Sequence, residues 1–372
     1  MRTNTQLTAA IRQIDDWIDP NGVSAAVISV RYQGAEIASH AAGMLKNGMP
    51  VREDTLFGLA SVTKPITAAG VLALVDDGLV SLDEPVVRFL PEFGAPAADG
   101  HPEREAGRGL ITVRQLLSHT SGLPEDLSSG VLPLRNQPTL TEISDAMMHA
   151  PLQFDPGTAL RYSNCGYGVL GRLIERVTGE DIWAFVQSRI LGPMNLQDIH
   201  ARPNIAAYDR IATVLDVRNS GTRHESYNSP YWRDLAIPWG GLYGTAENVA
   251  RFADCFLPGA EAVLSSAARE AMTTDQANGV AGGLQMLRLT WHPAFWGLGW
   301  EIKGTKRRHW TGDYTSPATY CHWGAAGTLV WTDPTRALTV AVFGNRTSYN
   351  GWPFMPIARW ARISNAIVAA VS

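Results

Sequence analysis

A serine and a lysine three residues apart are the first residues in this chain that could perform chemistry together. Ser61 and Lys64 lie in residues 58–74, which read as a helix with the serine in its first turn or at its cap. Positions i and i+3 share one face of a helix, so the hydroxyl and the amine are expected to meet. The residues after Lys64 are almost all apolar or small, which predicts a buried helix.

This placement would give both side chains a use. Burial disfavours the charged form of a lysine, so the amine of Lys64 can act as a base near neutral pH. A serine beside such a base becomes a nucleophile, and the start of a helix offers N–H groups to a developing oxyanion. The alternative is a capping serine and a lysine that reaches solvent. A Ser-x-x-Lys pair is common by chance, so the pair alone does not decide between these readings.

Composition limits the class of protein. The 372 residues are 45% hydrophobic and 18% charged, as in a globular protein with a large core. A net charge of -4 without a basic run argues against nucleic acid as a partner. No apolar stretch is long enough to span a membrane, and no signal peptide is evident. Three cysteines lack metal-type spacing and read as free thiols, so a cytoplasmic location is expected, or a periplasmic one for a processed chain.

Hydrophobic periodicity predicts the elements that must position the pair. Helical spacing indicates a first helix near residues 7–18, and alternation indicates a hairpin of strands 24–32 and 36–43. A second hairpin is expected about the Asp-Pro turn at 333–334, followed by a final helix over 355–371. Helices are also predicted in the middle of the chain, at residues 113–118, 141–149 with Thr141 as its cap, 169–177 and 246–256.

The order of these elements predicts an α+β fold. An antiparallel sheet flanked by helices is expected from residues 1–60 and 285–372, because strand patterns occur near both chain ends. Residues 61–284 would form a mainly helical inserted domain, with the active site at the interface. Residues 200–238 are long, irregular and polar, which is typical of a functional rim or lid.

Two more segments carry candidate functional residues. Tyr162-Ser163-Asn164 precedes a helix, and residues 322–328, His-Trp-Gly-Ala-Ala-Gly-Thr, open a strand. With Ser61 and Lys64, in this order and at these separations, they resemble the motifs of the serine β-lactamase and penicillin-binding-protein superfamily. The Tyr-x-Asn form is closest to its class C branch, which includes the family VIII carboxylesterases. Weaker likenesses to the same family occur at residues 116–124, 240–246 and 297–300.

The resemblance implies a β-lactamase/transpeptidase-like fold and a role for each motif residue. Ser61 would be the acylated nucleophile, and Lys64 or Tyr162, or the two as a coupled pair, would take its proton. Asn164 would orient Lys64 and the substrate. The backbone N–H groups of Ser61 and Ala325 would form the oxyanion hole. His119, within the segment 116–124, is interpreted as a structural histidine.

The third motif departs from the family pattern. His322 stands where β-lactamases and transpeptidases usually place a lysine, and a histidine is largely neutral at pH 7. Recognition of a carboxylate is therefore doubtful, and uncharged esters or amides are expected. Trp323 replaces a small residue, and Gly324 would allow close approach of the strand to the substrate. Other tryptophans are candidates either for an apolar pocket or for the core: Trp239, Trp296, Trp300, Trp310 and Trp331.

The sequence therefore predicts a serine hydrolase that cleaves carboxylic esters of small molecules through an acyl-enzyme, without cofactor or metal. Alternatives with the same fold are an amide or peptide hydrolase, a weak β-lactamase or an acyltransferase. A non-catalytic penicillin-binding protein is disfavoured because Ser61, Lys64 and Tyr162 are all present. A metallohydrolase and an α/β-hydrolase are disfavoured because the chain lacks H-x-x-x-H and G-x-S-x-G.

Overall fold

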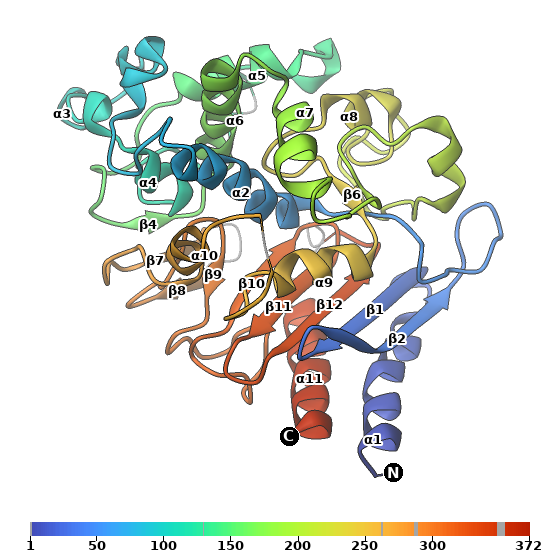
Figure 1. Cartoon of the computed structure of the whole chain (residues 1–372). Coiled ribbons are helices and arrows are strands. Elements are labelled where there is room, and N and C mark those ends of the chain that lie inside the picture. The colour runs from blue at the N-terminus through green and yellow to red at the C-terminus, as the bar shows by residue number, and fades with distance from the viewer. Residues whose placement is uncertain (1, 129, 262, 286–288, 348–353) are drawn as a thin grey trace.

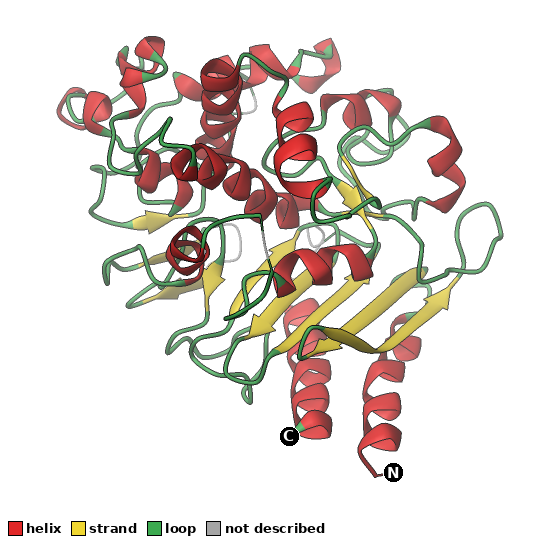
Figure 2. Ribbon diagram, viewed as in Figure 1, coloured by secondary structure: helices red, strands yellow, loops and turns green. Residues whose placement is uncertain are grey.

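A six-stranded antiparallel sheet forms the base of the molecule. The computed structural model describes residues 2–128, 130–261, 263–285, 289–347 and 354–372. It confirms the α+β fold: helices gather above the sheet and also pack on its faces (Figures 1 and 2). The strand order is β2-β1-β12-β11-β10-β9. In chain order the strands are β1 (Ala25–Tyr32), β2 (Ala35–Gly43), β9 (Glu301–Ile302), β10 (Tyr320–Gly324), β11 (Thr328–Asp333) and β12 (Leu338–Gly344).

Both chain ends contribute to this sheet, as predicted. β1 pairs with β12 in a register that runs from Ala26 opposite Gly344 to Tyr32 opposite Leu338. Helices α1 (Arg2–Ile11) and α11 (Phe354–Val371) pack side by side on one face of the sheet. The N-terminus lies at the end of α1 and the C-terminus at the end of α11, close to each other (Figure 1). Helix α9 (Ala246–Asp254) covers the other face, although it comes from the middle of the chain. The division into domains at residues 61 and 284 stays a prediction.

Helix α2 (Thr63–Asp76) lies at the centre of the molecule, between the sheet and the other helices (Figure 1). Its residues from Thr63 to Leu74 are all buried, so the predicted burial of this helix is confirmed. Helices α6 (Asn164–Thr178), α7 (Ile182–Val186) and α10 (Ser266–Thr273) pack against it, and α4 (Val113–Leu117) and α5 (Leu140–Met148) pack on α6. The short helices α3 (Pro102–Glu105) and α8 (Pro230–Leu235) also lie above the sheet (Figure 1).

Two details of this layer correct the sequence-based predictions. The cap of α5 is Thr139 and not Thr141: the Thr139 hydroxyl accepts from the N–H of Glu142, whose carboxylate accepts from the N–H of Thr139. Residues 200–238 are not wholly irregular, because they contain a 3-10 helix (Ile205–Arg210) and α8, which begins at Pro230 after a Ser229 cap.

Two small sheets hold the segments that lead to Ser61 and Tyr162. β3 (Phe57–Gly58), which ends three residues before Ser61, pairs with β6 (Tyr243–Gly244), and β6 also pairs with β5 (Ile199–His200). β4 (Leu160–Arg161), directly before Tyr162, pairs with β7 (Gly282–Leu284), which continues to β8 (Leu289–Trp291). The chain is thus held by backbone hydrogen bonds just before both residues, which limits their freedom.

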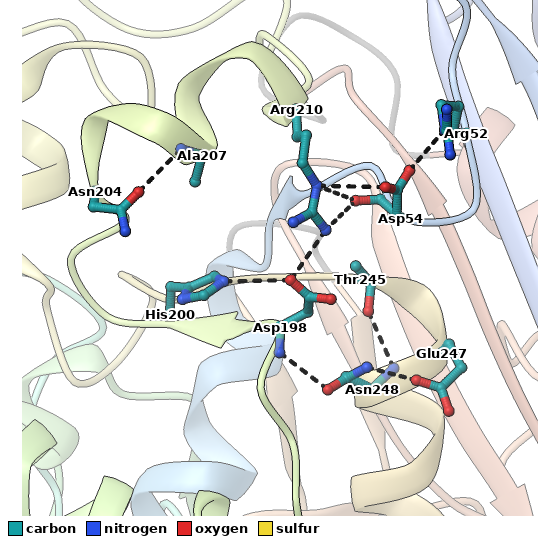
Figure 3. A network of polar contacts seen from close by, with 10 residues as sticks. All are labelled: Arg52, Asp54, Asp198, His200, Asn204, Ala207, Arg210, Thr245, Glu247 and Asn248. Atoms are coloured by element: carbon teal, nitrogen blue, oxygen red, sulfur yellow. Dashed lines mark hydrogen bonds and ion pairs between the residues drawn. The ribbon is translucent and has the colours of Figure 1, made fainter.

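A polar network fixes the approach to β3 (Figure 3). Arg210 donates through Nη2 to the carbonyl of Asp54 at 2.6 Å and to the carboxylate of Asp198 at 3.0 Å. The backbone N–H of Asp198 in turn donates to Oδ1 of Asn248 at 3.2 Å. The backbone of Leu56 also pairs with the segment around Arg210. The start of the 200–238 segment is therefore fastened to the strand that leads to Ser61.

Within the described residues, no helix combines the length and apolar character that crossing a membrane requires. The three cysteines are buried and unbridged, as expected. The cytoplasmic location stays a prediction.

Candidate active site

Ser61 lies in a tight 3-10 turn, Ala60–Val62, immediately before α2. Ala60 has a φ of +47°, in the left-handed region that residues with a Cβ adopt at a cost of about 1–2 kcal/mol. This bend points the half-buried Ser61 into a cavity. The N-cap of α2 is Val62, without a side-chain hydrogen bond, so the Ser61 hydroxyl does not cap the helix. Backbone strain next to a reactive side chain is typical of a functional turn.

The amine of Lys64 is completely buried and contacts three oxygen atoms. Nζ lies 3.1 Å from Ser61 Oγ, 2.7 Å from Asn164 Oδ1 and 2.8 Å from the backbone carbonyl of Trp239. Burial lowers the pKa of Lys64 to about 7, while the charges of Asp126 and Glu125 act in the opposite direction. Near neutral pH this amine is therefore divided between its ammonium and neutral forms.

The three contacts orient the neutral amine. A neutral amine has two N–H bonds and one lone pair. The carbonyl oxygens of Asn164 and Trp239 only accept, so they take the two N–H bonds and leave the lone pair facing Ser61 Oγ. The amide of Asn164 is itself held by Asp126, whose carboxylate accepts from Nδ2 at 2.8 Å. The geometry is that of a base aimed at a hydroxyl proton.

Tyr162 enters the site from the end of β4 and is also buried. Lys64 Nζ lies 4.6 Å from the centre of its ring. Burial raises the pKa of the Tyr162 phenol well above its ordinary value, and the Ser61 hydroxyl nearby lowers it only in part. Among the described residues, the Tyr162 hydroxyl has no hydrogen-bond partner, so Ser61 is a near neighbour of the phenol and not a bonded partner. Tyr162 is thus a neutral phenol at pH 7.

His119 contacts the backbone and the tyrosine ring of the second motif, Tyr162-Ser163-Asn164. It has a φ of +61° and is buried, and its Nδ1 accepts from the backbone N–H of Ser163 at 3.0 Å. Its ring lies 4.6 Å from that of Tyr162, centre to centre. Burial and the nearby Lys64 hold the pKa of His119 well below its usual value, so the ring is neutral. These contacts fit the structural role expected for this histidine.

Strand β10 closes the other side of the site. Trp323 and Ala325 line the cavity, whereas His322 does not belong to its lining among the described residues. His322 is 1% exposed, and burial together with Lys64 lowers its pKa to about 3. Its Nδ1 donates to the carbonyl of Trp323 at 2.9 Å. This histidine is therefore a neutral group behind the site.

Gly324 allows another segment to pack closely against β10, and that segment is the turn that holds Ser61. A Cβ at this position would lie 2.3 Å from the carbonyl oxygen of Leu59 and from Thr328 Oγ1. Thr328 also donates to that carbonyl at 2.9 Å. Any side chain at residue 324 would push β10 away from the turn and displace Ala325, the expected second oxyanion donor.

A cavity of about 470 Å³ lies over Ser61. One wall is apolar and is built by α5, α8 and the loops around them, with Leu132, Leu134, Ile143, Met147, Trp232 and Trp239 among its residues. The rim is polar and includes Glu125, Asp126, Arg135, Arg218, Asn219 and His224. Of the candidate pocket tryptophans only Trp239 lines the cavity with Trp323, whereas Trp296, Trp300, Trp310 and Trp331 are buried in the core.

Comparison of the chain with known proteins identifies its family. The family model described as Beta-lactamase matches residues 8–359. The chain belongs to the β-lactamase family. Among curated relatives it is 34% identical over 256 residues to esterase EstB of Burkholderia gladioli, covering 61% of this chain and 64% of the esterase. It is 32% identical over 319 residues to penicillin-binding protein 4 of Amycolatopsis lactamdurans, covering 82% of this chain and 75% of that protein. The chain thus spans less than two thirds of the length of EstB.

Solved structures confirm the fold predicted from the motifs. A family VIII carboxylesterase superimposes with a TM-score of 0.78 at 21% identity, covering 100% of this chain and 98% of that one. A D-amino acid amidase from Ochrobactrum anthropi SV3 has a TM-score of 0.73 at 22% identity, with all of both chains covered. The same fold therefore occurs in a protein named as a carboxylesterase and in one named as an amidase.

The structure brings together Ser61, Lys64, Tyr162 and Asn164, and it adds two groups that the motifs did not indicate. Asp126 orients Asn164, and the carbonyl of Trp239 is the third acceptor of Lys64. Asp126 lies two residues after the segment 116–124, so that segment was the available signal for it. A backbone carbonyl leaves no signal in the sequence.

Proposed function

We propose that this protein is a serine hydrolase that cleaves carboxylic esters through an acyl-enzyme on Ser61. The observation that carries the proposal is the position of Ser61 Oγ, 3.1 Å from a buried amine whose pKa is about 7. A base with its pKa near the working pH and within hydrogen-bond reach of a nucleophile meets the two requirements of general-base catalysis. The cavity above Ser61 provides room for a substrate.

The proton of each step has a defined destination. Ser61 Oγ attacks the ester carbonyl as its proton passes to the neutral amine of Lys64. The backbone N–H groups of Ser61 and Ala325 then stabilise the oxyanion, and loss of one such donor costs roughly 10²–10³ in rate. Collapse of the tetrahedral adduct expels the alcohol, which leaves with the proton that Lys64 took from Ser61, so Lys64 is again a neutral amine. In the second half, water gives a proton to Lys64, attacks the acyl group, and Ser61 recovers its proton as it leaves.

Two features support an uncharged ester as substrate. The cation that the family usually places on the third motif is replaced by His322, which burial keeps neutral. The wall of the cavity is largely apolar, which suits an acyl or alkyl group. The relative EstB is named an esterase. Acyl transfer to another alcohol would use the same intermediate.

An amide that carries an amino group is the second candidate. Glu125 and Asp126 line the cavity close to Ser61 and would attract an ammonium. The D-amino acid amidase with the same fold makes D-amino acid amides the natural test substrate. Turnover of such an amide well above that of any ester would replace the leading proposal.

The proposal is tested by labelling and by turnover. A fluorophosphonate probe should label Ser61, as shown by peptide mass spectrometry, and Ser61→Ala should lose both the label and hydrolysis of p-nitrophenyl esters. Ser128→Ala, at an exposed serine of the same cavity rim, should keep the label. Hydrolysis that persists in Ser61→Ala would exclude this serine as the nucleophile. Nitrocefin and D-phenylalanine amide complete the substrate panel.

A further inference from the structure

The cavity over Ser61 has a polar side that the proposed chemistry does not use. Asn219, His224 and Ser226 line this side, and all three come from one loop, residues 218–228. The Ser226 hydroxyl, the Asn219 amide and both ring nitrogens of His224 make no hydrogen bond with another described residue. Ser226 is only 5% exposed, so its hydroxyl is more than a surface group. The three side chains are therefore free to bind a ligand in the cavity.

Hydrogen bonds within the loop hold its shape. The side chain of Asn228 closes the base: its Oδ1 accepts from the N–H of Val214 at 2.9 Å, and its Nδ2 donates to the carbonyl of Val214 at 2.9 Å. Asn228 Nδ2 also donates to Glu225 at 2.7 Å, and Glu225 accepts from the N–H of Gly221 at 2.9 Å. A loop that is ordered before its ligand arrives loses little entropy on binding.

Tyr227 joins the loop to the reacting centre. Its φ is +65°, in a region that a bulky residue adopts only at a cost. The side chain packs in a small apolar cluster with Ala60 and Ala326. These two alanines are the chain neighbours of the proposed nucleophile and of the expected second oxyanion donor. Strained backbone beside a cavity is typical of functional sites, and here it holds Ser226 next to the place where the ester reacts.

The three free groups share one property. With the imidazole in its neutral form, each can both donate and accept a hydrogen bond. A carboxylate only accepts and an ammonium only donates, whereas an alcohol hydroxyl does both and so matches all three groups. Two arginines and two carboxylates line the cavity, so their formal charges cancel; these are Arg135, Arg218, Glu125 and Asp126. The loop therefore suits an uncharged group that carries several hydroxyls.

The depth of the two sides decides which part of the ester each one binds. The apolar wall is deep, since Ile143, Met147 and Ile237 are all buried. The polar loop reaches solvent at Asn219, which is exposed. The acyl group stays on Ser61 through both half-reactions, whereas the alcohol leaves after the first. The acyl group therefore fits the deep apolar wall, and the departing alcohol fits the loop that opens to solvent.

We propose that residues 219–226 bind the alcohol part of the substrate, and that the substrates are esters of an apolar acid with an uncharged polyhydroxy alcohol of the glycerol or sugar type. This assignment rests on the proposed ester hydrolysis by Ser61. Water is the only co-reactant. The acyl–oxygen bond breaks, the oxygen of water ends in the carboxylic acid, and the polyol leaves with its own ester oxygen and one proton.

Matched esters of one acid provide the first test. Glyceryl 1-monobutyrate and propyl butyrate differ only in two hydroxyls, and 6-O-butyrylglucose has cyclohexylmethyl butyrate as its counterpart without hydroxyls. Each kcat/KM is divided by the rate of alkaline hydrolysis of the same ester, because nearby hydroxyls also activate the leaving group. One neutral hydrogen bond changes an equilibrium by about three- to tenfold, so at least one polyol ester should exceed its counterpart by about tenfold. Ratios below about threefold in both pairs would overturn the proposal, because the loop then faces only water.

Ser226→Ala provides the second test. It should lower the ratio of the preferred pair by about three- to tenfold, because a hydrogen bond to the polyol is lost while the acyl group is the same. Ser220→Ala, at an exposed serine of the same loop outside the described lining of the cavity, is the matched control and should keep the wild-type ratio. A general loss of folding affects both esters of a pair equally and leaves their ratio in place. A wild-type ratio in both Ser226→Ala and Asn219→Ala would contradict the assignment.

The labelling experiment separates the two proposals. If the fluorophosphonate fails to label Ser61, ester hydrolysis by this serine is wrong. If Ser61 is labelled and butyrate esters are hydrolysed, but the hydroxyls of the alcohol do not raise the rate, the acyl-enzyme stands and only the role given to residues 219–226 is wrong.

Discussion

Replacing Asp126 by asparagine should shift the pH dependence of acylation to lower pH. The Asp126 carboxylate raises the pKa of Lys64, in opposition to burial, and also accepts from Asn164 Nδ2. An asparagine at position 126 still offers an oxygen to that N–H, so the orientation of Asn164 is retained while the charge is removed. The amine then has a lower pKa and stays neutral, and therefore basic, to a lower pH.

The size of the shift follows from the geometry. The amide of Asn164 stands between the two charged groups, with hydrogen bonds of 2.7 Å on the lysine side and 2.8 Å on the aspartate side. The charges are therefore roughly 7 Å apart, and at an effective dielectric constant of about 20 this separation corresponds to nearly two pH units. Because Asp126 is exposed, solvent screening reduces the expected shift to about one unit.

The assay is the pH profile of kcat/KM, which reports the ionisations of the free enzyme. With a p-nitrophenyl ester, the acid limb of the wild-type profile should have its midpoint near the Lys64 pKa of about 7. In Asp126→Asn it should fall to about pH 6. Asp145→Asn, at an exposed carboxylate paired with Arg172 on the far side of α5, is the control and should not move the limb. An unchanged or raised midpoint in Asp126→Asn would refute Lys64 as the base.

Three further predictions follow from single positions. Gly324→Ala should lower kcat/KM by at least about 10²-fold on every ester while the protein still folds, because the added Cβ displaces β10 from the Ser61 turn. Leu134→Trp should reduce the volume of the cavity and lower kcat/KM for long acyl chains more than for acetate, in a chain-length series. Lys64→Met removes a group whose pKa falls from 10.5 in the unfolded chain to about 7 in the fold. Between these values the unfolded wild type binds more protons, so its stability relative to Lys64→Met should rise with pH in urea unfolding.

Local sequence patterns were enough to predict most elements. The hairpins β1–β2 and β11–β12 and the buried helix α2 each have a hydrophobic pattern that one geometry satisfies, and each is observed. A sheet shared by both chain ends was predictable because strand patterns occur near both ends of the chain, whereas the pairing of β1 with β12 within it was not predicted. The cap of α5 was misplaced by two residues, since Thr139 and Thr141 both precede the apolar run and only the Glu142 contact distinguishes them.

The site was harder to predict than the fold because its chemistry depends on distant residues. Lys64 meets Asn164 across 100 positions of sequence and the carbonyl of Trp239 across 175. The motifs therefore predicted a lysine beside Ser61. They did not predict which distant acceptors would bind its N–H groups and so orient its lone pair. For the same reason the sequence left the base open between Lys64 and Tyr162.

Burial is the property that separates these two groups. Desolvation acts against the charged form of each, but the charged form of a lysine is its acid and that of a tyrosine is its base. The same apolar surroundings therefore turn Lys64 into a better base and Tyr162 into a worse one. A lysine at position 322 would oppose this effect on Tyr162 with a second cation, whereas a buried neutral histidine leaves it intact. The exchange of one residue on β10 thus bears on the acid and base roles as well as on substrate charge.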